Sequence, residues 1–171
     1  MNHSSAQRQS AEYSFRAGAI LANSRYAAMD AGRSAIVALA GLPQIGAAAV
    51  RQLRQDGVGA GSLSRDEAEA LCMVERSAAL KSLEWDDFFI EAITSHCVWD
   101  LRPTGVVNEA QGEWLIAMAD RARTPNAFAV LVNVLAAAHR VPLWLTAAVK
   151  ARAARGWPGA DDARALVERQ G

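Results

Sequence analysis

The sequence predicts an all-α fold, a multi-helix bundle, on two observations. Hydrophobic residues recur at intervals of three and four along nearly the whole chain, which is the period of an amphipathic helix. No alternating run of β-branched residues bounded by turn signals is long enough for a sheet. The chain has 171 residues, and a chain of this size buries roughly two thirds of its unfolded surface. We therefore expect a self-sufficient hydrophobic core.

The first third of the chain is rich in alanine and glycine. Residues 1–10 are polar and are expected to be disordered, whereas residues 11–55 are expected to form helices that break near Gly41-Leu42-Pro43. The run 34–50 carries no charge, but it contains glycine and proline and is shorter than a bilayer crossing of about twenty residues. We expect it to be buried or to face a partner, and membrane contact stays open for this run.

A helical core domain is predicted over residues 56–156. Ser64 with Glu67 predicts a capping box at the start of its first helix, whose apolar stripe contains Ala68, Leu71 and Val74. Ser82 predicts a second start, because carboxylates follow in the first turn where the helix dipole is positive. The stripe of this helix is expected to be Trp85, Phe89, Ala92, Ile93 and His96.

The next boundaries are set by proline and by capping residues. Arg102-Pro103 ends the second helix, because the residue before proline avoids helical backbone angles. Asn108 caps a third helix, and Thr124-Pro125 predicts a fourth. The expected inner faces are Ala110, Trp114, Leu115 and Met118 for the third helix, and Phe128, Leu131, Val132, Leu135 and His139 for the fourth.

The C-terminal part of the chain predicts two more helices. Val141-Pro142 precedes a helix of about twelve residues, which Gly156 and Trp157-Pro158 close as a C-cap and turn. Residues 157–171 are expected to form this turn and a short helix, 161–169, packed on the core.

Two stretches of the chain, forty-four residues apart, share one twelve-residue frame. Both have an acid first, glycine sixth, an aliphatic residue eighth and a capping residue ninth. The first copy consists of Asp56, Gly61, Leu63, Ser64 and Glu67, and the second of Asp100, Gly105, Val107, Asn108 and Gln111. This is the outline of an EF-hand calcium loop. The sequence therefore predicts an EF-hand-like helix-loop-helix pair in which Leu63 and Val107 meet across a short two-stranded contact.

The two loops lack the oxygen ligands that calcium requires at the third and fifth positions. Those positions hold Val58 and Ala60 in one copy and Arg102 and Thr104 in the other. We therefore interpret the pair as degenerate, with glycine turning the chain and a polar residue capping the next helix. A weak site at Asp56, Glu67 or Asp100 stays open.

The other candidate ligands and nucleophiles have simpler interpretations. Asp87 with Glu91 and Glu109 with Glu113 are spaced as in di-iron bundles, but the Glu-x-x-His element of those proteins does not occur. His96 and Cys97 are neighbours and point about 100° apart on a helix, so they do not serve one small site. We expect His96 and His139 to satisfy backbone carbonyl groups. The sequence assigns no catalytic, cofactor-binding or metal residue and no cofactor.

Charge is segregated along the chain although the net charge is zero. Residues 1–55 carry +4, residues 56–120 carry −9 and residues 121–171 carry +5. Such segregation is consistent with intramolecular attraction, with self-association or with an acidic face for a basic partner. No basic patch with interleaved aromatic residues occurs, so we expect no nucleic-acid partner.

Cysteine and tryptophan content add two expectations. Cys72 and Cys97 match no zinc or redox spacing and no signal peptide opens the chain, so we expect free thiols and a cytoplasmic protein. Trp85, Trp99 and Trp114 are expected to wedge the helices around the second loop. An exposed Trp99 or Trp157 would mark a partner surface.

Several segments between about residues 60 and 150 resemble known helical proteins. They are residues 85–93, 102–107, 114–116, 131–135 and 138–142. They are similar to a bacterial all-helical family, and their glycine-to-glutamate helix entries resemble those of TerB-like domains of tellurite-resistance proteins. For the family no activity is implied. The TerB-like resemblance implies acidic metal-binding positions and membrane- or stress-associated complexes, and it maps no ligand onto a residue of this chain.

From the sequence we expect a non-enzymatic helical protein-interaction module with a protein partner or self-association. The alternative is a metal-responsive, TerB-like sensor or stress protein that uses the acidic loop residues Asp56 and Glu67. A third hypothesis is an enzyme that uses Cys72 or Cys97 as its nucleophile.

Overall fold

The computed structural model describes residues 31–59 and 61–158, and most of these are helical. The all-α prediction is confirmed. The expected N-terminal segments over residues 1–30 and the last helix over 161–169 lie outside the described residues. The elements are a helix at residues 31–39, β1 (Gln44–Ile45), α2 (Ala47–Gln55), α3 (Arg65–Ser77), β2 (Leu80–Lys81), α4 (Leu83–Ser95), the π-helix η1 (His96–Asp100), α5 (Glu109–Ala122), α6 (Pro125–Ala137) and α7 (Leu143–Ala154).

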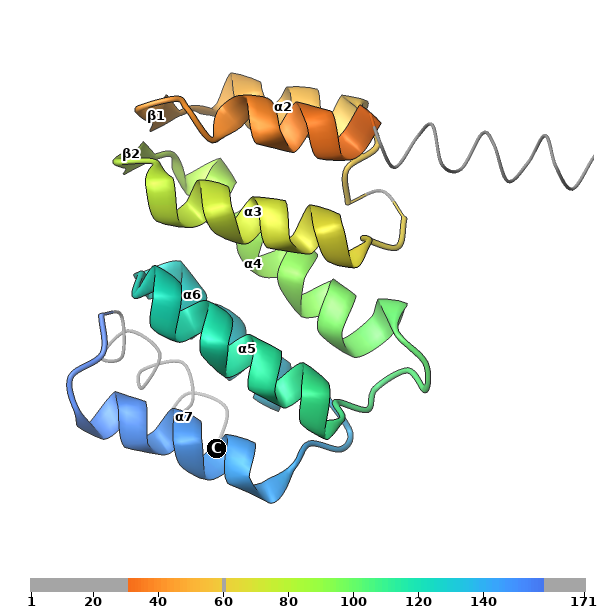
Figure 1. Ribbon diagram of the computed structural model, residues 1–171, viewed down its shortest axis with the longest axis vertical. Helices are drawn as coiled ribbons and strands as arrows, with labels where there is room; N and C mark the ends of the chain where they lie inside the picture. Colours follow the sequence, from red (N-terminus) through yellow and green to blue (C-terminus); the bar gives the residue numbers. More distant parts are fainter. Residues whose placement is uncertain (1–30, 60, 159–171) are drawn as a thin grey trace, which may run out of the picture.

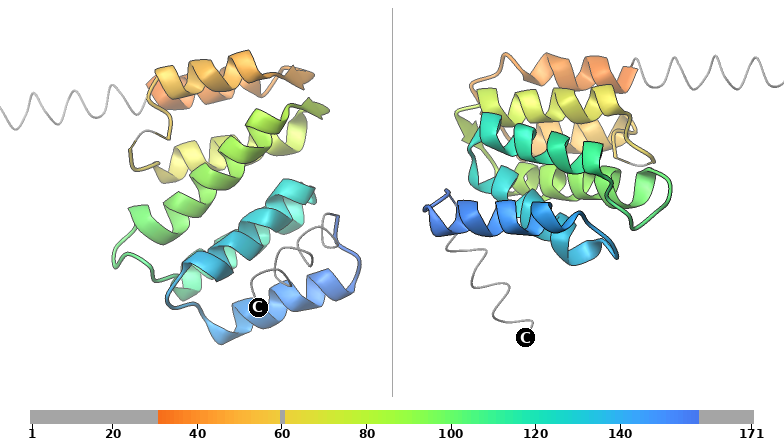
Figure 2. Two further views of the ribbon diagram at one scale, coloured as in Figure 1. Left: turned by 180° about the vertical axis from the view of Figure 1, so that it is seen from behind. Right: turned by 60° about the horizontal axis from the view of Figure 1, so that its bottom comes forward.

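The described helices form a stack of hairpins in two layers (Figure 1). Residues 31–39 pair with α2, α3 with α4, and α5 with α6. The first helix of each hairpin lies in the front layer of Figure 1, and the second helices, α2, α4 and α6, form the back layer (Figure 2). Helix α7 packs on α5 and α6 at the end of the stack. Each hairpin therefore covers the apolar face of the next one, as in helical repeat proteins.

Most helices begin where capping residues predict. The Ser64 side chain accepts a hydrogen bond from the Glu67 amide at 3.2 Å, and the Glu67 carboxylate accepts one from the Ser64 amide. Asn108 and Gln111 form the same reciprocal pair before α5. Thr124 caps α6, in which proline occupies the first turn. These three starts are confirmed, because each depends only on residues within one turn.

The core lies between the two layers and is centred on α4. Trp85, Phe88 and Phe89 are buried there with their rings about 6 Å apart. Ile36 and Leu53, from the alanine-rich first third, join the same apolar cluster. The first hairpin is thus packed on the others by the same hydrophobic contacts that join them to each other.

Two predicted inner faces are wrong in detail. Ala110 is exposed, because the capping box turns Gln111 and Gly112 toward the protein instead. His139 is also exposed, since α6 ends at Ala137 and does not extend its stripe that far. The buried residues of α6 are Ala127, Phe128, Val130, Leu131 and Val134.

The predicted contact between Leu63 and Val107 is wrong. The described strand pairs join other connections: β1 pairs in parallel with β2, with Gln44 opposite Leu80, and Val106 forms a parallel bridge with Arg140. The two copies of the repeated frame have a different structural role, which is to connect successive hairpins. Residues 56–64 and 101–108 each lead from the back-layer helix of one hairpin to the front-layer helix of the next, so the repeat marks successive hairpins.

The uncharged run 34–50 does not form one continuous helix. Its helix ends at residue 39, and a turn and β1 precede α2. Among the described residues, no helix combines the length and the apolar character that a membrane crossing requires.

Candidate functional site

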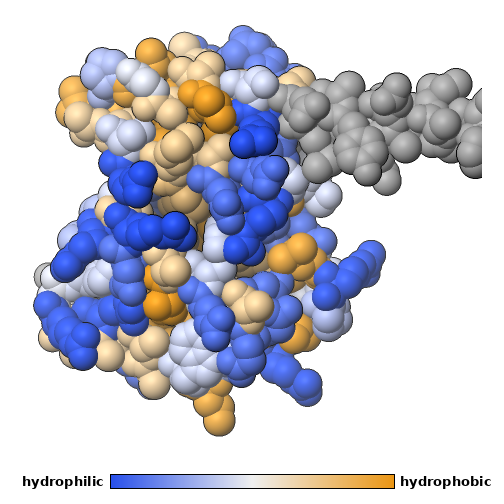
Figure 3. All heavy atoms as spheres, in the orientation of Figure 1, coloured by the Kyte–Doolittle hydropathy of each residue, from blue (hydrophilic) through white to orange (hydrophobic). Residues whose placement is uncertain are grey.

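A groove of about 330 Å³ runs along the outer face of α3. We call it the α3 groove. Residues 31–39 form one wall and α5 the other, and α3 lies between them. Its lining consists of Arg33, Val37, Asp66, Glu69, Ala70, Cys72, Met73, Arg76, Trp114, Met118, Arg121 and Ala122. Figure 3 views this face, on which hydrophobic surface lies between hydrophilic side chains.

The floor of the α3 groove is apolar. Ala70, Trp114 and Met118 are almost fully buried in it. Val37 is 44% exposed and Met73 is 39% exposed, so both present large apolar side chains to solvent. Such exposed apolar side chains around a concave surface are typical of a binding site.

Specific contacts hold the groove walls in place. The Arg65 guanidinium lies 4.3 Å from the ring centre of Trp114 and so joins α3 to α5. On the other side, a Cβ added at Gly32 would collide with Glu67 Oε1, which shows how closely residues 31–39 approach α3. The Ser77 hydroxyl donates to the Ala40 carbonyl at 3.2 Å at the far end.

The charges of the α3 groove are arranged by position along α3. Asp66 and Glu69 lie near the start of the helix and are paired with Arg33 at 3.7 Å and with Arg65 at 2.8 Å. The hydrogen bond from Arg65 is the main reason that the pKa of Glu69 is lowered.

The opposite end of the groove is basic. Arg76 is in the last turn of α3 and Arg121 in the last turn of α5. Arg121 Nε donates to the Ala117 carbonyl oxygen. Among the described residues neither arginine forms an ion pair.

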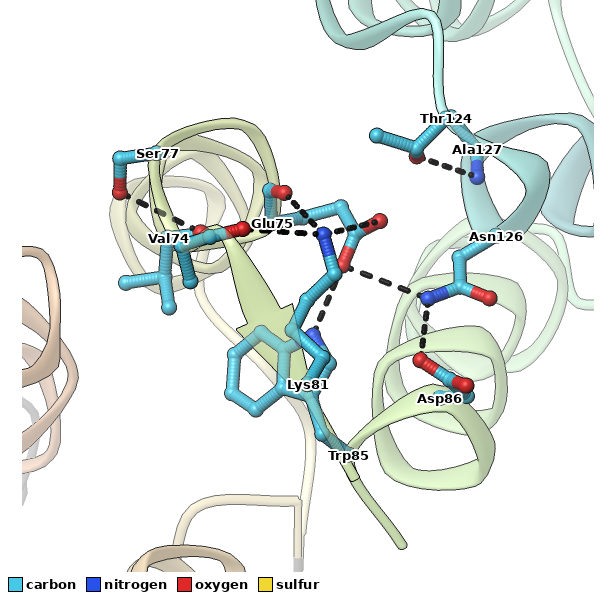
Figure 4. Close-up of polar contacts among 10 residues, drawn as sticks. Val74, Glu75, Ser77, Lys81, Trp85, Asp86, Thr124, Asn126 and Ala127 are labelled. Carbon is cyan, nitrogen blue, oxygen red and sulfur yellow. Dashed lines mark hydrogen bonds and ion pairs between the residues drawn. The ribbon is translucent and has the colours of Figure 1, made fainter. Parts of the chain in front are cut away.

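A buried polar network lies behind α3 and joins three helices (Figure 4). The Glu75 carboxylate is fully buried and accepts hydrogen bonds from Trp85 Nε1 at 2.7 Å and from Asn126 Nδ2 at 3.4 Å. Lys81 Nζ lies 3.4 Å from Glu75 Oε1 and donates to the Glu75 carbonyl at 2.8 Å. Asn126 Nδ2 also donates to Asp86 at 2.6 Å. The network fixes α3 against α4 and α6.

The three predicted loop carboxylates face separate partners. Asp56 accepts from the Gln52 amide group, Glu67 is held in its capping box, and Asp100 Oδ2 accepts from the Leu63 amide at 2.9 Å. The structure does not gather them into one site. Over the described ranges, no group of three or more His, Cys, Asp or Glu side chains is placed to hold a metal ion.

In each of the two candidate carboxylate pairs, one carboxylate binds another side chain of the protein and the other is exposed. Glu91 forms an ion pair with Arg54 at 2.9 Å. Glu109 accepts a hydrogen bond from Trp144 Nε1. Asp87 and Glu113 are exposed on the surface.

The two central histidines have different environments. His96 is buried and its Nδ1 donates to the Leu63 carbonyl at 2.8 Å, as predicted, while its Nε2 has no hydrogen-bond partner within the described part of the chain. Burial lowers the pKa of His96. His139 packs on the exposed Trp99 ring at 5.9 Å and against Gly105, whose positive φ of 75° and missing Cβ allow this approach.

The two thiols are not activated. Burial raises the pKa of Cys72 to about 12 and that of Cys97 to about 12. A thiol with such a pKa forms almost no thiolate at neutral pH, which is the reactive species.

The tryptophans divide between core and surface. Trp85 and Trp114 are buried, as expected, whereas Trp99 is 45% exposed. Trp157 is half-buried beneath the Arg123 guanidinium, 5.1 Å from its ring centre.

Some of the oppositely charged segments of the chain are joined by ion pairs within the molecule. Arg33 with Asp66 and Arg54 with Glu91 join the basic N-terminal part to the acidic middle. In the basic C-terminal part, Arg152 forms a hydrogen-bonded ion pair with Asp120, which raises the pKa of Arg152.

Sequence reasoning missed both the α3 groove and the Glu75 network. The groove residues of α3 do follow a helical stripe, from Asp66 through Met73 to Arg76, but its charged ends resemble an ordinary solvated face. Comparisons of the chain with protein-family profiles, with curated proteins and with solved structures gave no match.

Proposed function

We propose that this chain is a non-enzymatic helical interaction module that binds a helical segment of a partner protein in the α3 groove. The observation that carries the proposal is that Val37 and Met73, two exposed apolar side chains on neighbouring helices, line one concave surface with an apolar floor. Amphipathic helices bind in grooves of this kind through side chains at helical spacing.

Two further observations support a binding role over chemistry. The raised pKa values of Cys72 and Cys97 disfavour a thiol nucleophile. The carboxylates of Glu67 and Asp100 are engaged in hydrogen bonds that shape the loop before α3.

A photocrosslinking experiment tests the proposal. The residue p-benzoylphenylalanine replaces Met73 in the full chain, and in a matched variant it replaces Leu143, which is 92% exposed on α7 and outside the groove. We expect irradiation of cells to give a discrete protein adduct from position 73 and not from position 143. An adduct of twice the chain's mass would identify a second copy as the partner.

The proposal is wrong if position 73 gives no adduct, or if both positions give the same adducts. In the second case contact would reflect exposure alone.

A further inference from the structure

We propose that the α3 groove selects an amphipathic helix whose first turn is acidic and which lies antiparallel to α3 and α5. This inference rests on the proposed function and adds the charge and the direction of the bound segment. Three features of the groove carry it: its length, its charge and its orientation.

The length of the groove fits a short helix. Asp66, Met73 and Arg76 lie on one stripe of α3, and residues 66–76 span about 15 Å of helix rise. A partner helix of about three turns covers that distance. Its apolar stripe would contact the exposed side chains of Val37 and Met73, above the floor that Trp114 and Met118 form.

The charge of the groove fits acidic side chains at one end. The last turns of α3 and α5, which carry Arg76 and Arg121, lie at the same end of the groove (Figure 1), and neither arginine has an ion pair among the described residues. Asp66 and Glu69 lie nearer the start of α3 and are already paired with Arg33 and Arg65, although the charge of Arg121 also acts on Glu69. Carboxylates placed at the basic end would meet both guanidinium groups and make charge-assisted hydrogen bonds partly shielded from water.

The orientation of α3 and α5 sets the direction of the partner. Helices α3 and α5 run in the same direction (Figure 1), and their last turns carry Arg76 and Arg121, so the negative ends of both helix dipoles lie at this end of the groove. This end favours the positive N-terminus of a third helix. Aspartate and glutamate are also the residues that stabilise the first turn of a helix. Acidic residues in the first turn therefore stabilise the partner helix itself and also pair with both arginines. Both effects occur together only when the partner lies antiparallel to α3 and α5.

Binding of a designed probe tests the inference. The probe is a fluorescein-labelled synthetic helix of about sixteen residues, with leucines at i, i+3, i+4 and i+7 and two glutamates in its first turn. A matched probe carries glutamine in place of the glutamates. At low salt we expect the full chain to bind the acidic probe about tenfold more tightly than the glutamine probe. Circular dichroism checks that the two probes have equal helicity.

Substitution of Arg76 and Arg121 tests whether the preference for the acidic probe arises in the groove. The double variant R76Q/R121Q should bind both probes equally, whereas R51Q/R140Q, which removes two exposed arginines outside the groove, should keep the tenfold preference. A third probe with the glutamates in its last turn should lose the preference, because it places them beside Asp66 and Glu69.

Several outcomes overturn the inference. If both probes bind equally well to the unmodified chain, the groove takes helices without regard to charge, and the proposed function survives. If neither probe binds, the inference is wrong. The proposed function is then tested independently by the crosslinking experiment at position 73.

Other occupants of the groove give distinct results. If the acidic probe binds only after Asp161 and Asp162 are changed to asparagine, the chain's own C-terminal residues compete for the groove and the inference is wrong. If sedimentation shows a dimer that the acidic probe dissociates, a second copy occupies the groove, and the inference is again wrong.

Discussion

At the scale of single residues, Glu75 makes the least ordinary contacts in the described structure. A fully buried carboxylate is costly to remove from water unless it is paired and hydrogen-bonded. Here Lys81, Trp85 and Asn126 supply those partners from three elements, β2, α4 and α6 respectively. The network therefore fixes which faces of the helices meet, in addition to contributing to stability.

Removing the Glu75 carboxylate should strongly destabilise the fold. In E75A the buried Trp85 N–H loses its acceptor and the Lys81 ammonium loses its ion-pair partner, so we expect the free energy of unfolding to fall by about 3 kcal/mol. In E75Q an amide oxygen still accepts from Trp85, so the loss should be smaller. Urea denaturation measures both.

The matched control is E69A on the same helix. Glu69 is exposed and pairs with Arg65 on the surface, so its removal should cost about 0.5 kcal/mol or less. Equal losses for E75A and E69A would contradict the structural role of the network.

The contacts of Glu75 could not be predicted from the sequence, whereas the helix caps could. Caps such as Ser64 with Glu67 are predictable, because both partners lie within one turn. The partners of Glu75 are up to fifty-one positions away, and nothing in the sequence around Glu75 indicates burial. Only the packing of α6 on α4 brings Asn126 to it.

At the scale of elements, the repeated loop frame predicts the helix starts after both loops and does not predict which strands pair. The caps Ser64 and Asn108 and the turn glycine Gly105 hold as predicted. In the first loop the glycines with positive φ are Gly57 and Gly59, and Gly61 is not among them. The predicted strand contact does not hold, because two-residue strands are placed by the stacking of hairpins, as β1 and β2 show. A short aliphatic segment carries no information about its partner strand.

The two acids that open the loop frames should differ in importance. Asp100 accepts from the Leu63 amide, which is nearly inaccessible to water, whereas Asp56 is exposed and accepts from Gln52. D100A should lower the free energy of unfolding by about 1–3 kcal/mol, since it leaves a buried N–H without a partner. D56A should change it by about 0.5 kcal/mol or less.

Chemical denaturation of the two alanine variants measures this difference. D100N should lie close to the unmodified chain, because its amide oxygen can still accept from Leu63. If D56A and D100A destabilise the protein equally, the loops share one role after all, and the interpretation of residues 56–64 and 101–108 as hairpin connections loses its support.

At the scale of the whole molecule, the α3 groove is a product of stacking. Its walls come from three hairpins, and its charges come from helix ends whose sequence is unremarkable when each helix is considered alone. The sequence predicted the fold class, most helix boundaries and the buried tryptophans. It could not predict a concave surface, because that depends on the spacing between helices that are distant in the chain.

The stability of the whole fold should also depend on pH through His96. The imidazole is buried beneath the loop before α3, near Asp100, Arg65 and Glu67, and burial holds its pKa below the ordinary value. In the unfolded chain it takes up a proton near pH 6.5. Between the folded pKa and about pH 6.5 the unfolded state therefore binds more protons, so stability is lost as the pH falls.

The variant H96N tests this linkage, because asparagine can still donate to the Leu63 carbonyl but does not titrate. For the unmodified chain, the free energy of unfolding should fall between about pH 7 and pH 5 by at most about 1.4 kcal/mol per pH unit more than in H96N. Carboxylates that titrate below this range are common to both proteins and cancel in the comparison. H139N, which changes an exposed histidine, should keep the full slope. Parallel pH profiles for H96N and the unmodified chain would mean that His96 is protonated equally in the folded and unfolded states, and that its burial beneath Leu63 imposes no charge penalty on the fold.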